Sequence, residues 1–226
     1  MSYRYDNDLE FLGRCTNEEL KELFDLLVYD PKDGEQRVTS TLTYSEEYKK
    51  YGTDYSKYWR RIAEELQLYG GNTVVNNFIR FGSGVTYREI LQDVAKTLKV
   101  PFDKIASTEK IEYVVLEKII SEIFAKMSPK EARKIFSELS NDEIVSKIKN
   151  SATDFNSAQL ENLTFSLLNK GITGIIGGIL AGPIGLLLNG LIIADIAGPA
   201  TRVTIPAVML IATLRRKKIH NLEMPI

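Results

Sequence analysis

Apolar residues recur at intervals of three and four positions along the first part of the chain, which predicts amphipathic helices. The phrase Thr16-Asn17-Glu18-Glu19 has the form of a capping box before an apolar series, and Thr86-Tyr87-Arg88-Glu89 opens a second helix in the same way. The apolar stripe over residues 108–127 predicts a well-buried helix. Further helices are predicted from residue 128, where proline follows at a first helical position, and over residues 155–169. We therefore expect an all-α protein built as a multi-helix bundle.

A glycine-rich apolar stretch follows at residues 171–214, with only Asp195 and Arg202 as charged residues. Three of its glycines are spaced four apart and lie on one helical face, which lets helix backbones approach closely. The positions that we expect to pack helices together or to contact lipid are Gly174, Gly178, Gly182, Pro183, Gly185 and Gly190.

Two interpretations of this stretch stay open. Residues 171–194 carry no charge, and as one helix kinked at Pro183 they would cover a hydrocarbon core of about 30 Å. Alternatively, Gly182 and Pro183 form the turn of a buried hairpin whose arms, 171–181 and 184–196, are each too short to cross a bilayer. The run is apolar on all faces, which slightly favours membrane contact.

The end of the chain combines a second apolar run with a basic cluster. Residues 203–214 would reach only about 18 Å as a helix, which suits an interfacial or re-entrant element rather than a span. We expect a final helix from Ile205 to Ile219, capped by Thr204. The four cations that follow the run would be available to anionic lipid headgroups: Arg215, Arg216, Lys217 and Lys218. A polar break near residue 150 divides the chain into a helical body, residues 1–150, and a C-terminal part, residues 151–226, holding the hairpin and this helix.

Aromatic residues form a second pattern, stepping by three or four positions so that they share a helical face. They are Tyr44, Tyr48, Tyr51, Tyr55 and Tyr58, with Trp59 beside them. Such a stripe is either a surface for a protein partner or a half-buried face, and the second interpretation is favoured because amphipathic stripes usually face a core. Gly52-Thr53 is a candidate break between two helices. The phrases Gly70-Gly71-Asn72 and Phe81-Gly82-Ser83-Gly84 are candidate helix C-caps.

Composition and charge limit the kinds of partner and of chemical site that we expect for this chain. Residues 1–170 hold four more acidic than basic residues, which argues against nucleic acid as a partner. Cys15 is the single cysteine and His220 the single histidine, so we expect a buried structural thiol, no metal site and no cofactor. The carboxylates of residues 16–25 and 109–122 alternate with lysines and are interpreted as solvated faces. The N-terminus lacks an apolar signal region, which predicts a cytoplasmic protein.

Several phrases resemble the YaaW-like family of bacterial proteins. They are DLEFL and CTNEEL at 8–20, ELQLYGGNT at 65–73, YREILQDV at 87–94, GPIG and LNG at 182–190, RVTIPAV at 202–208 and LRR at 214–216. The resemblance covers nearly the whole chain and implies an all-helical bacterial protein. The middle region is also remotely similar to chaperones that assemble the ubiquinol–cytochrome c reductase. Neither resemblance brings catalytic residues to this chain.

Two functions are therefore expected as alternatives. The first is a non-enzymatic protein, peripheral or integral at the inner membrane, that associates with or perturbs lipid through its glycine-rich C-terminal region. The second is a soluble protein-binding or assembly module in which the same region is buried core. Under either alternative the partner is lipid, another protein or a second copy of the chain.

Overall fold

The computed structural model describes residues 3–30, 34–38, 40–73, 84–126 and 201–223. Within these residues the chain is helical and forms no strand, so the expectation of an all-α protein is confirmed, with one isolated bridge between Tyr29 and Gln36. The elements are η1 Glu10–Arg14, α1 Asn17–Val28, η2 Leu42–Tyr44, α2 Glu46–Tyr51, η3 Tyr55–Tyr58, α3 Trp59–Thr73, α4 Tyr87–Thr97, α5 Thr108–Lys126 and α11 Thr201–Glu223.

Two helices begin where their local sequence dictates. The Thr16 side chain accepts a hydrogen bond from the backbone N–H of Glu19, and the Glu19 carboxylate accepts one from the Thr16 N–H. Thr86 and Glu89 repeat this reciprocal arrangement at the start of α4. Both predicted capping boxes are therefore confirmed. Each one stabilises the start of its helix, because it satisfies N–H groups that have no partner within the helix.

The tyrosine-rich stretch folds as short pieces rather than as one helix. Helix α2 ends at Tyr51, and the next residue, Gly52, has a φ of 56°, in the left-handed region that glycine adopts without steric penalty. The chain then turns through η3 into α3. The predicted break at Gly52 is therefore confirmed.

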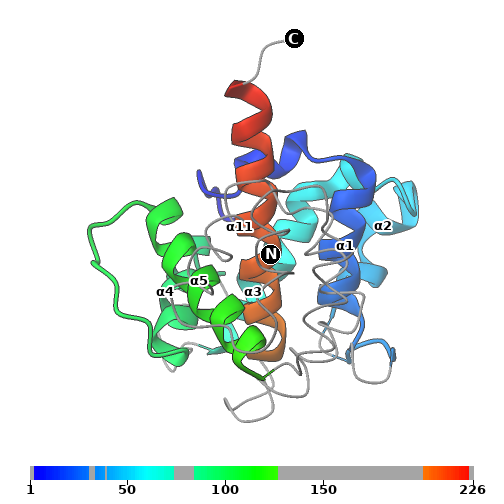
Figure 1. Cartoon of the computed structure of the whole chain (residues 1–226). Coiled ribbons are helices and arrows are strands. Elements are labelled where there is room, and N and C mark those ends of the chain that lie inside the picture. The colour runs from blue at the N-terminus through cyan, green and yellow to red at the C-terminus, as the bar shows by residue number, and fades with distance from the viewer. Residues whose placement is uncertain (1–2, 31–33, 39, 74–83, 127–200, 224–226) are drawn as a thin grey trace, which may run out of the picture.

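Helix α11 runs through the bundle in the opposite direction to its neighbours (Figure 1). The early residues of α1, α4 and α5 meet the end of α11, as the contacts of Glu19 with Lys217, of Glu112 with Arg215 and of Tyr87 with Glu112 establish. Helix α5 ends on the side of the bundle where α11 begins. Residues 127–200 therefore connect two points on the same side of the body.

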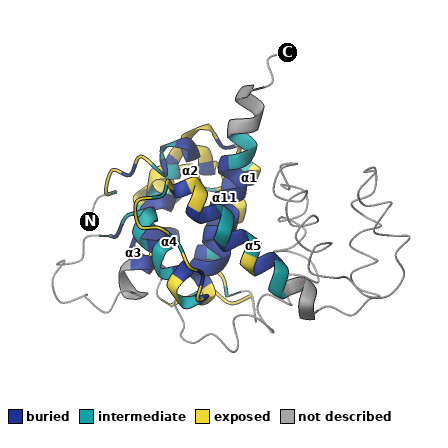
Figure 2. Ribbon diagram, turned by 60° about the vertical axis from the view of Figure 1, so that its left-hand side comes forward, coloured by how far each residue is buried: buried dark blue, intermediate teal, exposed yellow. Residues whose placement is uncertain are grey.

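The apolar run at residues 203–214 is the centre of the core, as the dark blue ribbon of α11 in Figure 2 shows. Nearly all its side chains are buried, and α11 packs against α1, α3, α4 and α5. Its expected role as an interfacial or re-entrant element is therefore wrong. The helix also begins at Thr201, so that Thr204 lies within it instead of capping it, and it continues through Pro206.

The C-terminal helix thus shares one core with the helices that precede residue 127. The expected domain boundary near residue 150 lies outside the described residues. So do the helix expected from residue 128, the helix at 155–169 and the glycine-rich run at 171–194, including Gly174, Gly178, Gly182, Pro183, Gly185 and Gly190. Among the helices of the described ranges, none has both the length and the hydropathy needed to cross a bilayer.

Gly70 is not a C-cap, because α3 continues past it to Thr73. A Cβ atom at this position would lie 2.3 Å from Cγ1 of Ile90 and 2.8 Å from Cγ2 of Val85. Glycine is required here because α3 and the start of α4 approach more closely than any side chain would permit. The expectation that Gly70 ends a helix is therefore wrong, because this glycine instead allows α3 to pack closely against α4.

Candidate functional site

A buried polar group lies where the end of α11 meets α4 and α5. Nε of Arg215 donates to Oε1 of Glu112 at 3.1 Å, and the hydroxyl of Tyr87 donates to the same oxygen at 2.8 Å. All three side chains are buried: Glu112 is 1% exposed, Arg215 7% and Tyr87 0%. A charge pair removed from water in this way requires hydrogen bonds to its remaining polar atoms, and Tyr87 supplies one of them.

Charge and burial act in opposite directions on this group. Burial lowers the pKa of Arg215, but the adjacent Glu112 carboxylate raises it to above its ordinary value, so the guanidinium stays charged. Burial raises the pKa of Tyr87 well above 10, so the phenol stays neutral and donates a hydrogen bond to Glu112. Burial raises the pKa of Glu112 above its ordinary value, because it outweighs the Arg215 charge and the hydrogen bonds from Tyr87 and Arg215 that favour the carboxylate. The arrangement is a buried ion pair with a neutral donor.

The N-terminal segment completes the surroundings of Arg215. Nη2 of Arg215 donates to the backbone oxygen of Asp8 at 2.5 Å, and its guanidinium lies 4.7 Å from the ring centroid of Phe11. The Asp8 carboxylate in turn accepts a hydrogen bond from Thr108 at the start of α5. The group therefore joins four separate parts of the chain.

The other three cations of the basic cluster also face the body. Lys217 and Lys218 both pair with the carboxylate of Glu19, at 2.6 and 2.8 Å, and Arg216 lies 5.2 Å from the ring centroid of Tyr113. The cluster Arg215–Lys218 thus holds the end of α11 against α1 and α5. Its contact with lipid headgroups stays a prediction, and these intramolecular contacts would compete with it.

Glu19 serves two elements at once. It belongs to the capping box of α1 and also receives both lysines from α11. Burial alone would raise the pKa of Glu19, but the hydrogen bonds from Lys217 and Lys218 outweigh it and hold the pKa at about 2. The carboxylate is therefore ionised throughout the neutral range.

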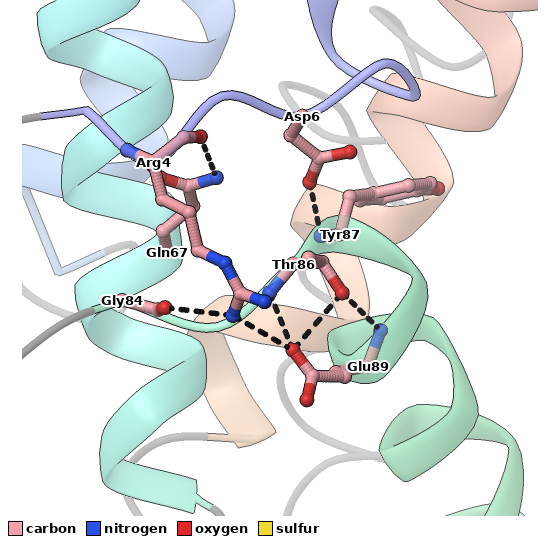
Figure 3. Close-up of polar contacts among 7 residues, drawn as sticks. All are labelled: Arg4, Asp6, Gln67, Gly84, Thr86, Tyr87 and Glu89. Atoms are coloured by element: carbon pink, nitrogen blue, oxygen red, sulfur yellow. Dashed lines mark hydrogen bonds and ion pairs between the residues drawn. The ribbon is translucent and has the colours of Figure 1, made fainter. Parts of the chain in front are cut away.

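The residues near the N-terminus connect α3 to α4 (Figure 3). The side-chain amide of Gln67 bonds to both backbone groups of Arg4, accepting at 3.2 Å and donating at 2.9 Å. Asp6 accepts a hydrogen bond from the backbone N–H of Tyr87 at 2.6 Å, and Arg4 pairs with Glu89. Asp6 thereby satisfies a further N–H at the start of α4, beyond those of the capping box.

The aromatic stripe divides into buried and exposed members. Tyr55 and Tyr58 are buried and pack with Tyr48 around Phe24, whose ring centroid lies 4.9 Å from that of Tyr55. Trp59 is partly buried and packs edge-on against Tyr3, whereas Tyr44 and Tyr51 are exposed. These positions match the favoured interpretation of a half-buried face, and a partner surface on the exposed members stays a prediction.

The start of α11 is built differently from its end. A small cavity of about 10 Å³ lies here, lined by Gly70, Ile90, Asp93, Val94, Thr97, Thr201 and Thr204. The hydroxyl of Thr204 is buried and makes no hydrogen bond. Arg202, the next cation along from the charge-free run 171–194, is exposed. At this end the Thr204 hydroxyl has no partner, and Arg202 forms no ion pair within the described ranges.

Two further features of the described residues concern the thiol of Cys15 and the arrangement of metal-binding side chains. Burial, with Glu19 nearby, raises the pKa of Cys15 to about 12, which keeps the thiol protonated. Its assignment as a buried structural thiol is confirmed. In the ranges that the structure describes, no cluster of His, Cys, Asp or Glu has the arrangement of a metal site.

The expectation that the carboxylates of 16–25 and 109–122 lie on solvated faces is wrong for Glu19 and Glu112, which are 7% and 1% exposed. The signal was present for Glu112, because it lies one helical turn before Leu116 and two before Ile120, on the buried face of α5. A carboxylate on such a face needs a buried partner. The partner, Arg215, lies 103 residues away and could not be inferred from spacing.

Comparisons with known proteins bear on the whole chain. A UPF0174 protein of Helicobacter pylori strain J99 is 42% identical, with 96% of this chain and 94% of the relative covered. The UPF0174 protein YaaW of Escherichia coli strain K12 is 34% identical, with 96% of each covered. The chain belongs to the UPF0174 family. The resemblance to YaaW-like bacterial proteins is thus confirmed, and the remote similarity to assembly chaperones stays a prediction.

Residues 3–38 match a domain family described as "Domain of unknown function (DUF3944)". In this member of the UPF0174 family those residues supply Arg4, Asp6, Asp8 and Glu19, whose partners lie on α3, α4, α5 and α11. The matched segment is therefore an integral part of the bundle. No solved structure matches the chain.

Proposed function

We propose that this protein is a non-enzymatic membrane-associating protein whose helical body carries the charge-free run 171–194 to the lipid at the cytoplasmic face of the inner membrane. The observation that carries the proposal is the difference between the two apolar runs. Residues 203–214 are buried within the body, whereas residues 171–194 have no charged side chain over a length that as a helix would reach about 36 Å.

The architecture of the described residues supports a core role for the run 203–214 and a separate, lipid-contacting role for the run 171–194. The connection that contains the run leaves from α5 and returns through α11 on the same side of the body. The body can therefore stay folded whatever the run contacts, because the end of α11 is held by the Arg215–Glu112 and Glu19–Lys217 pairs. The lipid-contacting residues would be Gly174, Gly178, Gly182, Pro183, Gly185 and Gly190 with their apolar neighbours.

The rival function is a soluble protein-binding or assembly module. One observation favours it: the run at 203–214, which has comparable hydropathy in the sequence, is core. If residues 171–194 are core in the same way, the protein has no lipid-contacting part.

The experiment replaces residues 171–194 by a glycine- and serine-rich linker of equal length and leaves α11 in place, because α11 is part of the core. Flotation with vesicles and thermal unfolding are measured for the full chain and the variant. We expect the variant to unfold cooperatively like the full chain but to lose flotation. Equal flotation of both would refute the proposal, and loss of folding would establish the soluble alternative. Tyr44→Ser, at an exposed tyrosine, is the control and should float like the full chain.

A further inference from the structure

Two exposed cations, one at the start of α11 and one after the end of α4, have no carboxylate partner among the described residues. Thr97, the last residue of α4, and Thr201, the first of α11, line the same cavity, so the two helix ends meet. Just beyond them, Lys99 and Arg202 are exposed. No ion pair within the described ranges includes either residue, whereas the nearby Lys96 pairs with Asp93.

The fold itself does not account for Arg202. A cation in the first turn of a helix is opposed by the positive end of the helix dipole, and an exposed guanidinium there adds no packing to the core. The four cations toward the other end of α11 each contact a carboxylate or an aromatic ring. Lys99 has an ordinary role as a cation after the end of α4, but its φ of 55° is an uncommon conformation for lysine.

The position of Arg202 along the chain indicates its partner. Seven residues separate it from the charge-free run 171–194, and the 203–214 run that follows is buried. It is therefore a surface cation of the body beside the point where the connection to that run begins. Helix α5 ends on the same side. Anionic phosphate groups at a membrane surface attract cations placed next to an inserted apolar segment.

We propose that the start of α11 is the face of the body that rests on the membrane, with Arg202 and Lys99 contacting the phosphate groups of anionic lipids. This inference rests on the proposed membrane association and adds its orientation and lipid class. It also moves the expected headgroup contact from Arg215–Lys218, which are engaged at the opposite end of α11, to two residues that no described carboxylate neutralises.

The test compares binding of the full chain to vesicles of phosphatidylcholine alone and to vesicles that also contain phosphatidylglycerol. The variant Lys99→Gln/Arg202→Gln removes both charges. The matched control, Lys57→Gln/Lys110→Gln, removes two exposed cations from the side of the body where α3 and α5 begin. Each contact with an anionic surface contributes about fivefold in affinity, so we expect the double variant to bind phosphatidylglycerol vesicles at least about tenfold more weakly.

On phosphatidylcholine vesicles the double variant should match the full chain, and on both vesicles the control should stay within about twofold of it. Equal weakening by the double variant and the control would show a non-specific response to net charge and would overturn the inference. So would no weakening by the double variant, although membrane association itself would then stand. If the full chain binds neither vesicle, the proposed function fails as well. Cooperative thermal unfolding of each variant confirms that the exposed substitutions leave the body folded.

Discussion

The two ends of α11 satisfy their polar groups in different ways. At its end, Arg215 and Lys217 meet the carboxylates of Glu112 and Glu19, which come from α5 and α1. At its start, Thr204 has a buried hydroxyl without a partner and Arg202 is exposed. The comparison teaches that the ion pairs that fix α11 in the bundle lie toward one end of this central helix, and that the other end carries groups whose placement the body alone does not explain.

The largest expected effect comes from breaking the buried ion pair. Arg215→Met leaves the Glu112 carboxylate in the core without its cation, and the loss of one partner of a buried pair costs about 3–5 kcal/mol. The free energy of unfolding in urea measures this loss. Arg202→Met, at the other end of the same helix, is the matched control and should change stability by less than about 0.5 kcal/mol.

A second variant separates charge from shape at this position. Glu112→Gln/Arg215→Met removes both charges, so no unpaired charge stays in the core, and it should be more stable than Arg215→Met alone. If the double variant is as unstable as the single one, the packing of Arg215 on Phe11 and Tyr87 accounts for the loss, and the ion pair does not.

The sequence predicted correctly those features that depend on residues close together in the chain. Thr16 with Glu19, and Thr86 with Glu89, announce their helices because a capping box is complete within four residues. Periodicity likewise located α5. It did not identify what covers each face, because Arg215 and Glu112 are brought together only by the packing of α11 across the bundle.

The same limit explains the two errors about α11. Its apolar run and basic cluster have the composition of an interfacial helix, and composition does not distinguish a lipid from a protein interior. In the folded protein, Glu112 and Glu19 lie opposite the cations of α11, and these pairs hold the helix in the protein interior. Gly70 was misread for a related reason, since its need for glycine comes from Ile90 on another helix.

A moderate effect is expected at the second contact of this end. Glu19→Gln weakens the pairing with Lys217 and Lys218, and hydrogen bonds to charged groups contribute about 1.5–3 kcal/mol. We expect a loss of about 2 kcal/mol at pH 7, measured by urea unfolding. Glu18→Gln, an exposed carboxylate in the same first turn, is the control and should lose less than about 0.5 kcal/mol.

The pH dependence of this loss has a defined sign. The pKa of Glu19 is about 2 in the folded protein and 4.5 ordinarily, so the folded state favours the ionised form. Its contribution is fully present above about pH 5 and is lost as pH falls toward 2. The difference in stability between the natural chain and Glu19→Gln should therefore shrink over that range. A difference that stays constant down to pH 2 would mean that the lysines do not stabilise the carboxylate.

The smallest expected effect lies at the start of α11, where Thr204→Val tests what the cavity contains. If the cavity is dry, valine removes an unsatisfied hydroxyl and the protein becomes more stable by about 1 kcal/mol. The cavity has room for about one water molecule, and its lining includes the polar residues Asp93 and Thr97, which favours occupation by water. We therefore expect Thr204→Val to lower stability by less than about 1 kcal/mol, since the water loses a partner.

Thr213→Val is the matched control for that substitution. The Thr213 hydroxyl is also buried in α11 but donates to the backbone oxygen of Met209 at 2.8 Å. That oxygen belongs to the helix backbone, so losing the extra donor should change stability by less than about 0.5 kcal/mol. A gain in stability that is specific to Thr204→Val would show a dry cavity and an uncompensated polar group.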